Sequence, residues 1–83
     1  MSDLFTIATK RPLYATDGVE IIRTRPLPDR KEPFVGYIKT TIGEALVPYS
    51  NKDLYEVLIN GSEISKEEYE NLEVTVRNYI SLN

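Results

Sequence analysis

Thirteen carboxylates are the side chains of this 83-residue sequence that best suit acid–base or metal chemistry. Paired Asp and Glu side chains can act as general acid and base, or they can bind Mg²⁺. No spacing among them specifies such a site, and the sequence contains no histidine and no cysteine, which removes the commonest general base, the thiolate nucleophile and the usual zinc ligands. The four glycines are scattered singly, so no glycine-rich loop is available to hold a phosphate. We therefore predict that the protein is not an enzyme and holds no metal or cofactor.

A proline-rich segment, residues 25–33, is the first candidate contact region. Its start, Arg25-Pro26-Leu27-Pro28, resembles a proline-rich ligand of SH3 domains, because such grooves bind an arginine and spaced prolines on a polyproline-II helix. Asp29 and Arg30 stand where further prolines would strengthen this resemblance, and an extended connecting loop is the simpler interpretation. The candidate contacts in this segment are Arg25, Leu27, Arg30 and Lys31.

Charge is unevenly distributed along the chain. The net charge is −3, and residues 41–83 carry eight acidic but only three basic side chains. An acidic patch would steer the protein towards a basic partner, such as the nucleic-acid groove of another protein. The simpler interpretation is a solvated helix surface. The candidate contacts of this acidic helix are Glu63, Glu67, Glu70 and Glu73.

The chain has six tyrosines but no tryptophan. Tyrosine is favoured at interfaces because it presents a rigid apolar ring with a polar tip. We expect Tyr69 to lie in the core, whereas Tyr37, Tyr49 and Tyr55 are candidate aromatic contacts.

Basic residues are concentrated in the first half of the chain, which raises the alternative of a nucleic-acid-binding module. Basic side chains would neutralise phosphates and an aromatic ring would stack on a base. The acidic net charge disfavours this alternative, because nucleic-acid-binding domains usually carry a basic balance. The residues that would serve it are Arg23, Arg25, Arg30 and Lys31, with Tyr37.

Apolar and β-branched runs predict several strands. Residues 4–9 form one such run, and residues 13–16 and 19–24 flank Asp17-Gly18, which favours a two-residue type I′ turn with Thr16 opposite Val19.

A strand is also expected at residues 34–42, with Gly36 marking a bulge or a close backbone approach, and a short strand at 45–47. Residues 52–59 fit either strand alternation or a helix with a capping box at Ser50 and Asp53, and we favour the strand.

A C-terminal helix is expected at about residues 66–81. Ser65 and Glu68 have the spacing of a capping box, in which each side chain bonds the other residue's backbone N–H. Tyr69, Leu72, Val76 and Ile80 recur every three or four residues and would form one buried stripe.

These elements predict an α+β fold, with a twisted antiparallel sheet of four or five short strands and one C-terminal amphipathic helix packed on a face. We expect a single domain over residues 1–83, strand-rich at 4–59. The sequence contains no signal peptide and no run long enough to cross a membrane, and the lack of cysteine favours the cytoplasm.

The leading hypothesis is a small acidic protein-binding domain, acting as an inhibitor or accessory factor that covers a partner's surface. The alternatives are the nucleic-acid-binding module and a structural subunit of a homo-oligomer. A domain of this size also suits a viral origin.

Overall fold

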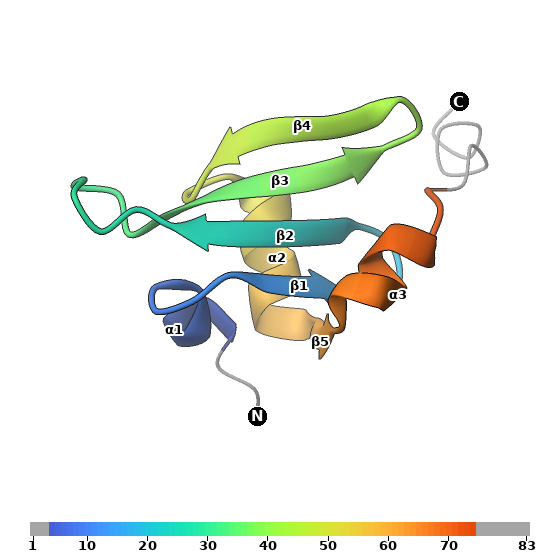
Figure 1. Ribbon diagram of the computed structural model, residues 1–83, viewed down its shortest axis with the longest axis horizontal. Coiled ribbons are helices and arrows are strands. Elements are labelled where there is room, and N and C mark those ends of the chain that lie inside the picture. The colour runs from blue at the N-terminus through green and yellow to red at the C-terminus, as the bar shows by residue number, and fades with distance from the viewer. Residues whose placement is uncertain (1–3, 75–83) are drawn as a thin grey trace.

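The computed structural model describes residues 4–74, which form one antiparallel sheet of five strands and three short helices (Figure 1). The strand order is β4-β3-β2-β1-β5. The strands are β1 Leu13–Thr16, β2 Ile21–Pro26, β3 Phe34–Thr40, β4 Gly43–Pro48 and β5 Ser62–Ile64, and the helices are α1 Leu4–Ala8, α2 Lys52–Asn60 and α3 Lys66–Asn71. The predicted α+β class and antiparallel sheet are confirmed.

One face of the sheet packs on α1 and α2 and holds the core. Figure 1 shows α2 running across the back of the strands, with α1 beside it. Gly36 of β3 makes room for Leu54 of α2, because a Cβ at position 36 would overlap the Leu54 side chain. Neither a bulge nor a close approach of another backbone occurs at this glycine, and the Leu54 side chain occupies the space instead. The buried residues of this core are Leu4, Ala8, Leu13, Ala15, Ile22, Phe34, Leu54, Val57 and Leu58.

Two predicted strands are helices. Residues 4–8 of the first predicted strand form α1, in which Leu4 and Ala8, four positions apart, both enter the core. Residues 52–59 belong to α2, which buries Leu54, Val57 and Leu58 at helical spacing. Strand propensity is overridden in both segments because only the helical period brings these side chains onto the sheet. The N-cap of α2 is Asn51, not Ser50, and its Oδ1 accepts the Leu54 backbone N–H at 3.0 Å.

The β1–β2 hairpin is shifted by two residues from the predicted register, since Thr16 pairs with Ile21 rather than with Val19. The Asp17 carboxylate accepts the backbone N–H groups of Val19 and Glu20 at 2.9 and 2.8 Å. Because of this Asx-type turn, the loop between β1 and β2 has four residues instead of the predicted two. A register shift of two residues leaves each side chain on its predicted face of the sheet, so Tyr14 and Ile21 still lie on the same face.

The hairpin of β3 and β4 differs only in its bounds. The predicted strand 34–42 ends at Thr40, and the predicted strand 45–47 extends over the six residues of β4. Thr41 and Ile42 make the turn between them, and Ile42 is 96% exposed.

The C-terminal helix is shorter than predicted and does not form the main core. Its capping box is confirmed, with the Ser65 hydroxyl accepting the Glu68 N–H and the Glu68 carboxylate accepting the Ser65 N–H. The helix ends at Asn71 because the backbone of Leu72 is extended. It lies on the face of the sheet opposite α2 (Figure 1), and the expected stripe positions Val76 and Ile80 lie outside the described residues. No helix among residues 4–74 is long and apolar enough to cross a membrane.

Two threonines on neighbouring strands predict opposite effects of the same substitution. The Thr24 side chain is buried, and its hydroxyl has no hydrogen-bond partner among the described residues. The Thr16 hydroxyl donates to the Glu20 carbonyl at 2.7 Å and accepts the Gly18 N–H at 3.1 Å. We expect Thr24→Val to raise the free energy of unfolding by roughly 1–2 kcal/mol and Thr16→Val to lower it by roughly 1 kcal/mol. Urea denaturation checks both, and a loss of stability in Thr24→Val would contradict the buried placement.

Candidate interaction surface

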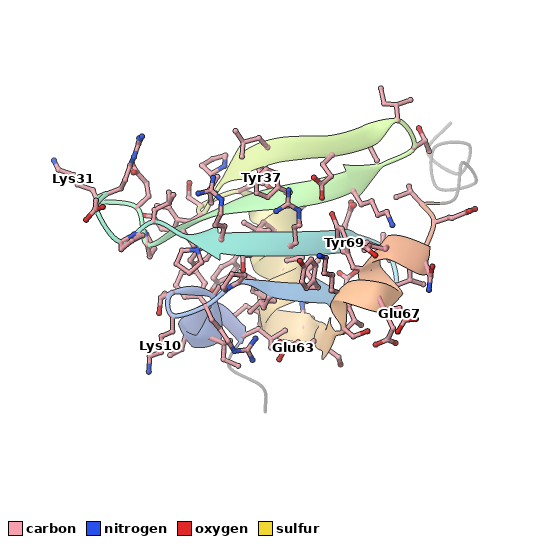
Figure 2. All side chains as sticks on the ribbon, in the orientation of Figure 1. Lys10, Lys31, Tyr37, Glu63, Glu67 and Tyr69 are labelled. Carbon is pink, nitrogen blue, oxygen red and sulfur yellow. The ribbon has the colours of Figure 1, made fainter. Side chains whose placement is uncertain are left out.

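The face of the sheet opposite α2 carries a cluster of polar and aromatic side chains. Strand alternation places Tyr14 of β1, Arg23 and Arg25 of β2, and Tyr37 and Lys39 of β3 on this open face. Helix α3 covers one end of it through Tyr69, whose ring lies 5.0 Å from that of Tyr14. Figure 2 shows Tyr37 on the part of the face that α3 leaves uncovered.

Arg23, Arg25 and Tyr37 form a group that we call the Arg–Tyr platform. The sheet register sets Arg23 directly opposite Tyr37, and the Arg23 guanidinium lies 3.7 Å from the centre of the Tyr37 ring. Arg25, two residues further along β2, donates through Nη2 to the Tyr37 hydroxyl at 3.2 Å. The tyrosine is therefore held at its ring by one arginine and at its tip by the other.

Glu44 of β4 fixes the Arg23 end of the platform. Its two carboxylate oxygens accept Nε and Nη2 of Arg23 at 2.7 and 2.9 Å, which is bidentate geometry. The Tyr69 hydroxyl also donates to this carboxylate. Hydrogen bonding from Arg23 lowers the pKa of Glu44, whereas burial and the neighbouring Glu44 raise the pKa of Tyr69. The pair is therefore ionised at neutral pH, and the phenol stays protonated as a donor.

Lys39 anchors the end of α3 to the sheet. Its Nζ donates to the carbonyl oxygens of Tyr69 and Leu72, and it lies 4.9 Å from the centre of the Tyr69 ring. A cation at the C-terminus of a helix satisfies carbonyls that have no partner within the helix. Lys39 is therefore occupied in holding α3 in place.

Arg25 and Lys39 are the cations of the open face without a carboxylate partner in the part of the chain that the structure describes, and Lys39 is already bound to the carbonyls of α3. There, the ion pairs are Arg23–Glu44 and Arg11–Glu63, and the contact of Arg25 is with a neutral hydroxyl. An exposed guanidinium held beside an aromatic ring presents several unused N–H donors. The platform therefore offers a fixed ring and an uncompensated positive charge.

The proline-rich segment is a compact turn rather than an extended polyproline-II segment. The Leu27 N–H donates to the Pro33 carbonyl at 3.1 Å, and the Arg30 N–H donates to the Leu27 carbonyl at 3.2 Å. Arg25 lies in β2 itself, Leu27 is half-buried, and Arg30 and Lys31 are exposed at the tip. Figure 2 shows Lys31 at the end of the molecule that projects beyond the sheet.

The predicted acidic contacts are not all on one helix. Glu63 lies in β5 and forms a bidentate ion pair with Arg11, which lowers the pKa of Glu63. Glu67 and Glu70 are exposed on α3, and Glu73 is exposed just after the end of that helix.

The three tyrosines proposed as contacts lie in different places. Tyr37 is on the open face, while Tyr55 is 49% exposed on α2, with its ring 6.0 Å from that of Phe5. Tyr49 is half-buried and packs edge-on against Phe34 at 6.0 Å between ring centres. The structure therefore brings together Arg23, Arg25 and Tyr37 from the predicted residues, and it adds Glu44, which the sequence prediction missed.

No three Asp or Glu side chains of residues 4–74 gather closely enough to hold a metal ion. Comparison with known proteins gives no further assignment, since no protein-family model, curated protein or solved structure matches the chain.

The ion pair between Arg23 and Glu44 predicts an acid-dependent loss of stability. Because the pKa of Glu44 is lower in the folded than in the unfolded protein, its contribution is complete above about pH 4.5 and is lost as the pH falls through the folded value. We expect Glu44→Gln to be less stable than the wild type at pH 7 and to lose less stability between pH 6 and pH 3. Urea denaturation across this range measures the difference.

Glu63→Gln is the matched control, because Glu63 also pairs with an arginine but its partner Arg11 is 53% exposed. Its effect should be smaller, as exposed ion pairs contribute little. Parallel pH profiles for Glu44→Gln and the wild type would contradict the geometry of the Arg23–Glu44 pair.

Proposed function

We propose that the protein is a small non-catalytic protein-binding domain that acts by covering part of a partner's surface, as an inhibitor or accessory factor. The observation that carries this proposal is the Arg–Tyr platform, which is ordered by contacts within the chain yet lies on the uncovered part of the sheet. Tyrosine and arginine are the residue types that most often dominate the binding energy of protein interfaces.

The order of the platform favours binding because less side-chain freedom remains to be lost on association. Immobilising a long side chain at an interface costs roughly 0.5–1.5 kcal/mol. Arg23 is already held by Glu44 through two hydrogen bonds and is stacked on Tyr37. A partner that contacts this face would therefore meet side chains close to their bound conformation.

The surroundings of Arg25 indicate the chemistry of the partner. Its guanidinium faces solvent, and Val35 and Pro48 follow it across the next two strands on the same face. An acidic side chain set beside an apolar one would complement this row, because a guanidinium binds a carboxylate through two parallel hydrogen bonds. We infer that the partner presents such a segment.

Nucleic-acid binding is the second candidate, and the exposed basic tip of the β2–β3 hairpin favours it. Arg30 and Lys31 lie in the same hairpin as Arg25 and could extend a path for phosphates. Two features weigh against it: Arg23 is neutralised by Glu44, and the guanidinium of Arg23 lies over the ring that would stack on a base. A base would therefore have to displace Arg23 or stack on its guanidinium.

Affinity capture from native lysate, with and without nuclease, tests the proposal. We expect the wild-type protein to retain a protein partner that resists nuclease and is identified by mass spectrometry. Tyr37→Ala and Arg25→Ala should each reduce the affinity for that partner about tenfold or more, as for central residues of an interface. Circular dichroism checks that both variants remain folded.

Tyr55→Ala is the matched control, because it removes the same side chain from the opposite side of the sheet. It should leave the partner bound. Retention by Tyr37→Ala together with loss in Tyr55→Ala would overturn the assignment of the surface. A capture that disappears with nuclease and weakens steeply with salt would favour nucleic acid instead.

A further inference from the structure

The outer strand β4 is an open sheet edge with an unusual lack of protection. It pairs with β3 along one side, and no described strand lies along its other side. Its residues are exposed except for the half-buried Val47, and Leu46 is 65% exposed. The opposite edge, β5, has only three residues. In an antiparallel strand at the edge of a sheet, alternate backbone N–H and C=O groups point away from the neighbouring strand, and such free groups are a template for pairing with another strand.

Strand β4 lacks two of the devices that usually prevent such pairing, a bulge and a lysine. Its register with β3 runs through six consecutive pairs without a bulge, and it contains no lysine. Its charged residue, Glu44, is held on the open face by Arg23 and Tyr69. Pro48 cannot donate a hydrogen bond and its carbonyl accepts the Asn51 N–H at 3.0 Å, so the hydrogen bonds to a new strand would centre on Leu46.

We propose that β4 pairs with β4 of a second copy of this chain, antiparallel and about a two-fold axis at Leu46. This register sets Leu46 opposite Leu46 of the second copy, Glu44 opposite Pro48, and Ala45 opposite Val47. No two like charges face each other, and Glu44, Leu46 and Pro48 of both copies lie on the same face of the joined sheet. A second copy is the occupant because the strand is complementary to itself in this way.

The two-fold pairing also creates an apolar contact across the seam. Tyr37 lies beside Leu46 within each chain, so the row across the dimer is Tyr37, Leu46, Leu46, Tyr37. The exposed leucine becomes covered by its counterpart, and a continuous sheet of ten strands results. Because the axis is perpendicular to the sheet, both copies of the Arg–Tyr platform lie on the same side, and a partner with two sites would bind both.

Sedimentation equilibrium of the full chain tests the pairing. A single strand seam buries less surface than a standard interface, so we expect a reversible dimer that predominates at about 100 µM and dissociates on dilution. Leu46→Lys should be monomeric at the same concentration because it opposes two like charges at the axis. Ile42→Lys is the matched control, since Ile42 is an exposed apolar residue in the turn outside β4, and it should dimerise as the wild type does.

Charge complementation tests the register itself. Leu46→Glu should also be monomeric, and mixing it with Leu46→Lys should restore the mass of a dimer because position 46 faces position 46. A wild-type chain that remains monomeric would overturn the proposal, as would dimers of Leu46→Lys or a mixture that stays monomeric.

Dimerisation and partner binding can be separated. Arg25 lies on β2, two strands from the edge, so Arg25→Ala should reduce capture of the partner and leave the dimer mass unchanged. Loss of the dimer in Arg25→Ala would contradict pairing through β4.

Discussion

The bidentate ion pair between Arg23 and Glu44 is the interaction on which the open face of the sheet depends. Its two residues come from strands separated by β3, so the pair spans the strand that carries Tyr37. Arg23 can lie flat on the Tyr37 ring because Glu44 holds its guanidinium from the far side, and Tyr69 reaches the same carboxylate from α3. Breaking the pair would release the platform and one of the contacts of α3 together. Charge-assisted hydrogen bonds that are partly shielded from water are strong enough to hold these side chains in one conformation.

The core determines which face remains available. Helix α2 approaches β3 closely because Gly36 has no side chain, and Leu54 occupies that space. The core face is thereby filled by α1 and α2, while the opposite face receives only the six residues of α3. Polar side chains that alternate with core residues along β2 and β3 therefore meet on a surface that no other described element covers. The outer side of β4 is also uncovered, because no other described strand follows it in the sheet.

Features that depend on neighbouring residues could be predicted from the sequence, whereas those that depend on register could not. The Ser65–Glu68 capping box is local, and it was found. The β1–β2 turn was wrong because the Asp17 carboxylate binds two backbone N–H groups, an alternative that competes with the type I′ turn. Helix α1 has five residues, too few to show a helical period. Arg23, Arg25 and Tyr37 were proposed together as a nucleic-acid-binding set, but the role of Glu44 requires knowing that β4 pairs with β3, since its partner Arg23 is 21 positions earlier.

The central claim is that the Arg–Tyr platform is ordered before any partner binds, and nuclear magnetic resonance of the free protein tests it most directly. A guanidinium stacked on a tyrosine ring experiences the ring's magnetic field, and an Nε–H bound to a carboxylate exchanges slowly with water. The account predicts a slowly exchanging Arg23 Nε–H and Arg23 side-chain protons shifted upfield, with the upfield shift lost in Tyr37→Leu. Arg23 signals at the positions and exchange rates of a solvent-exposed arginine would contradict it.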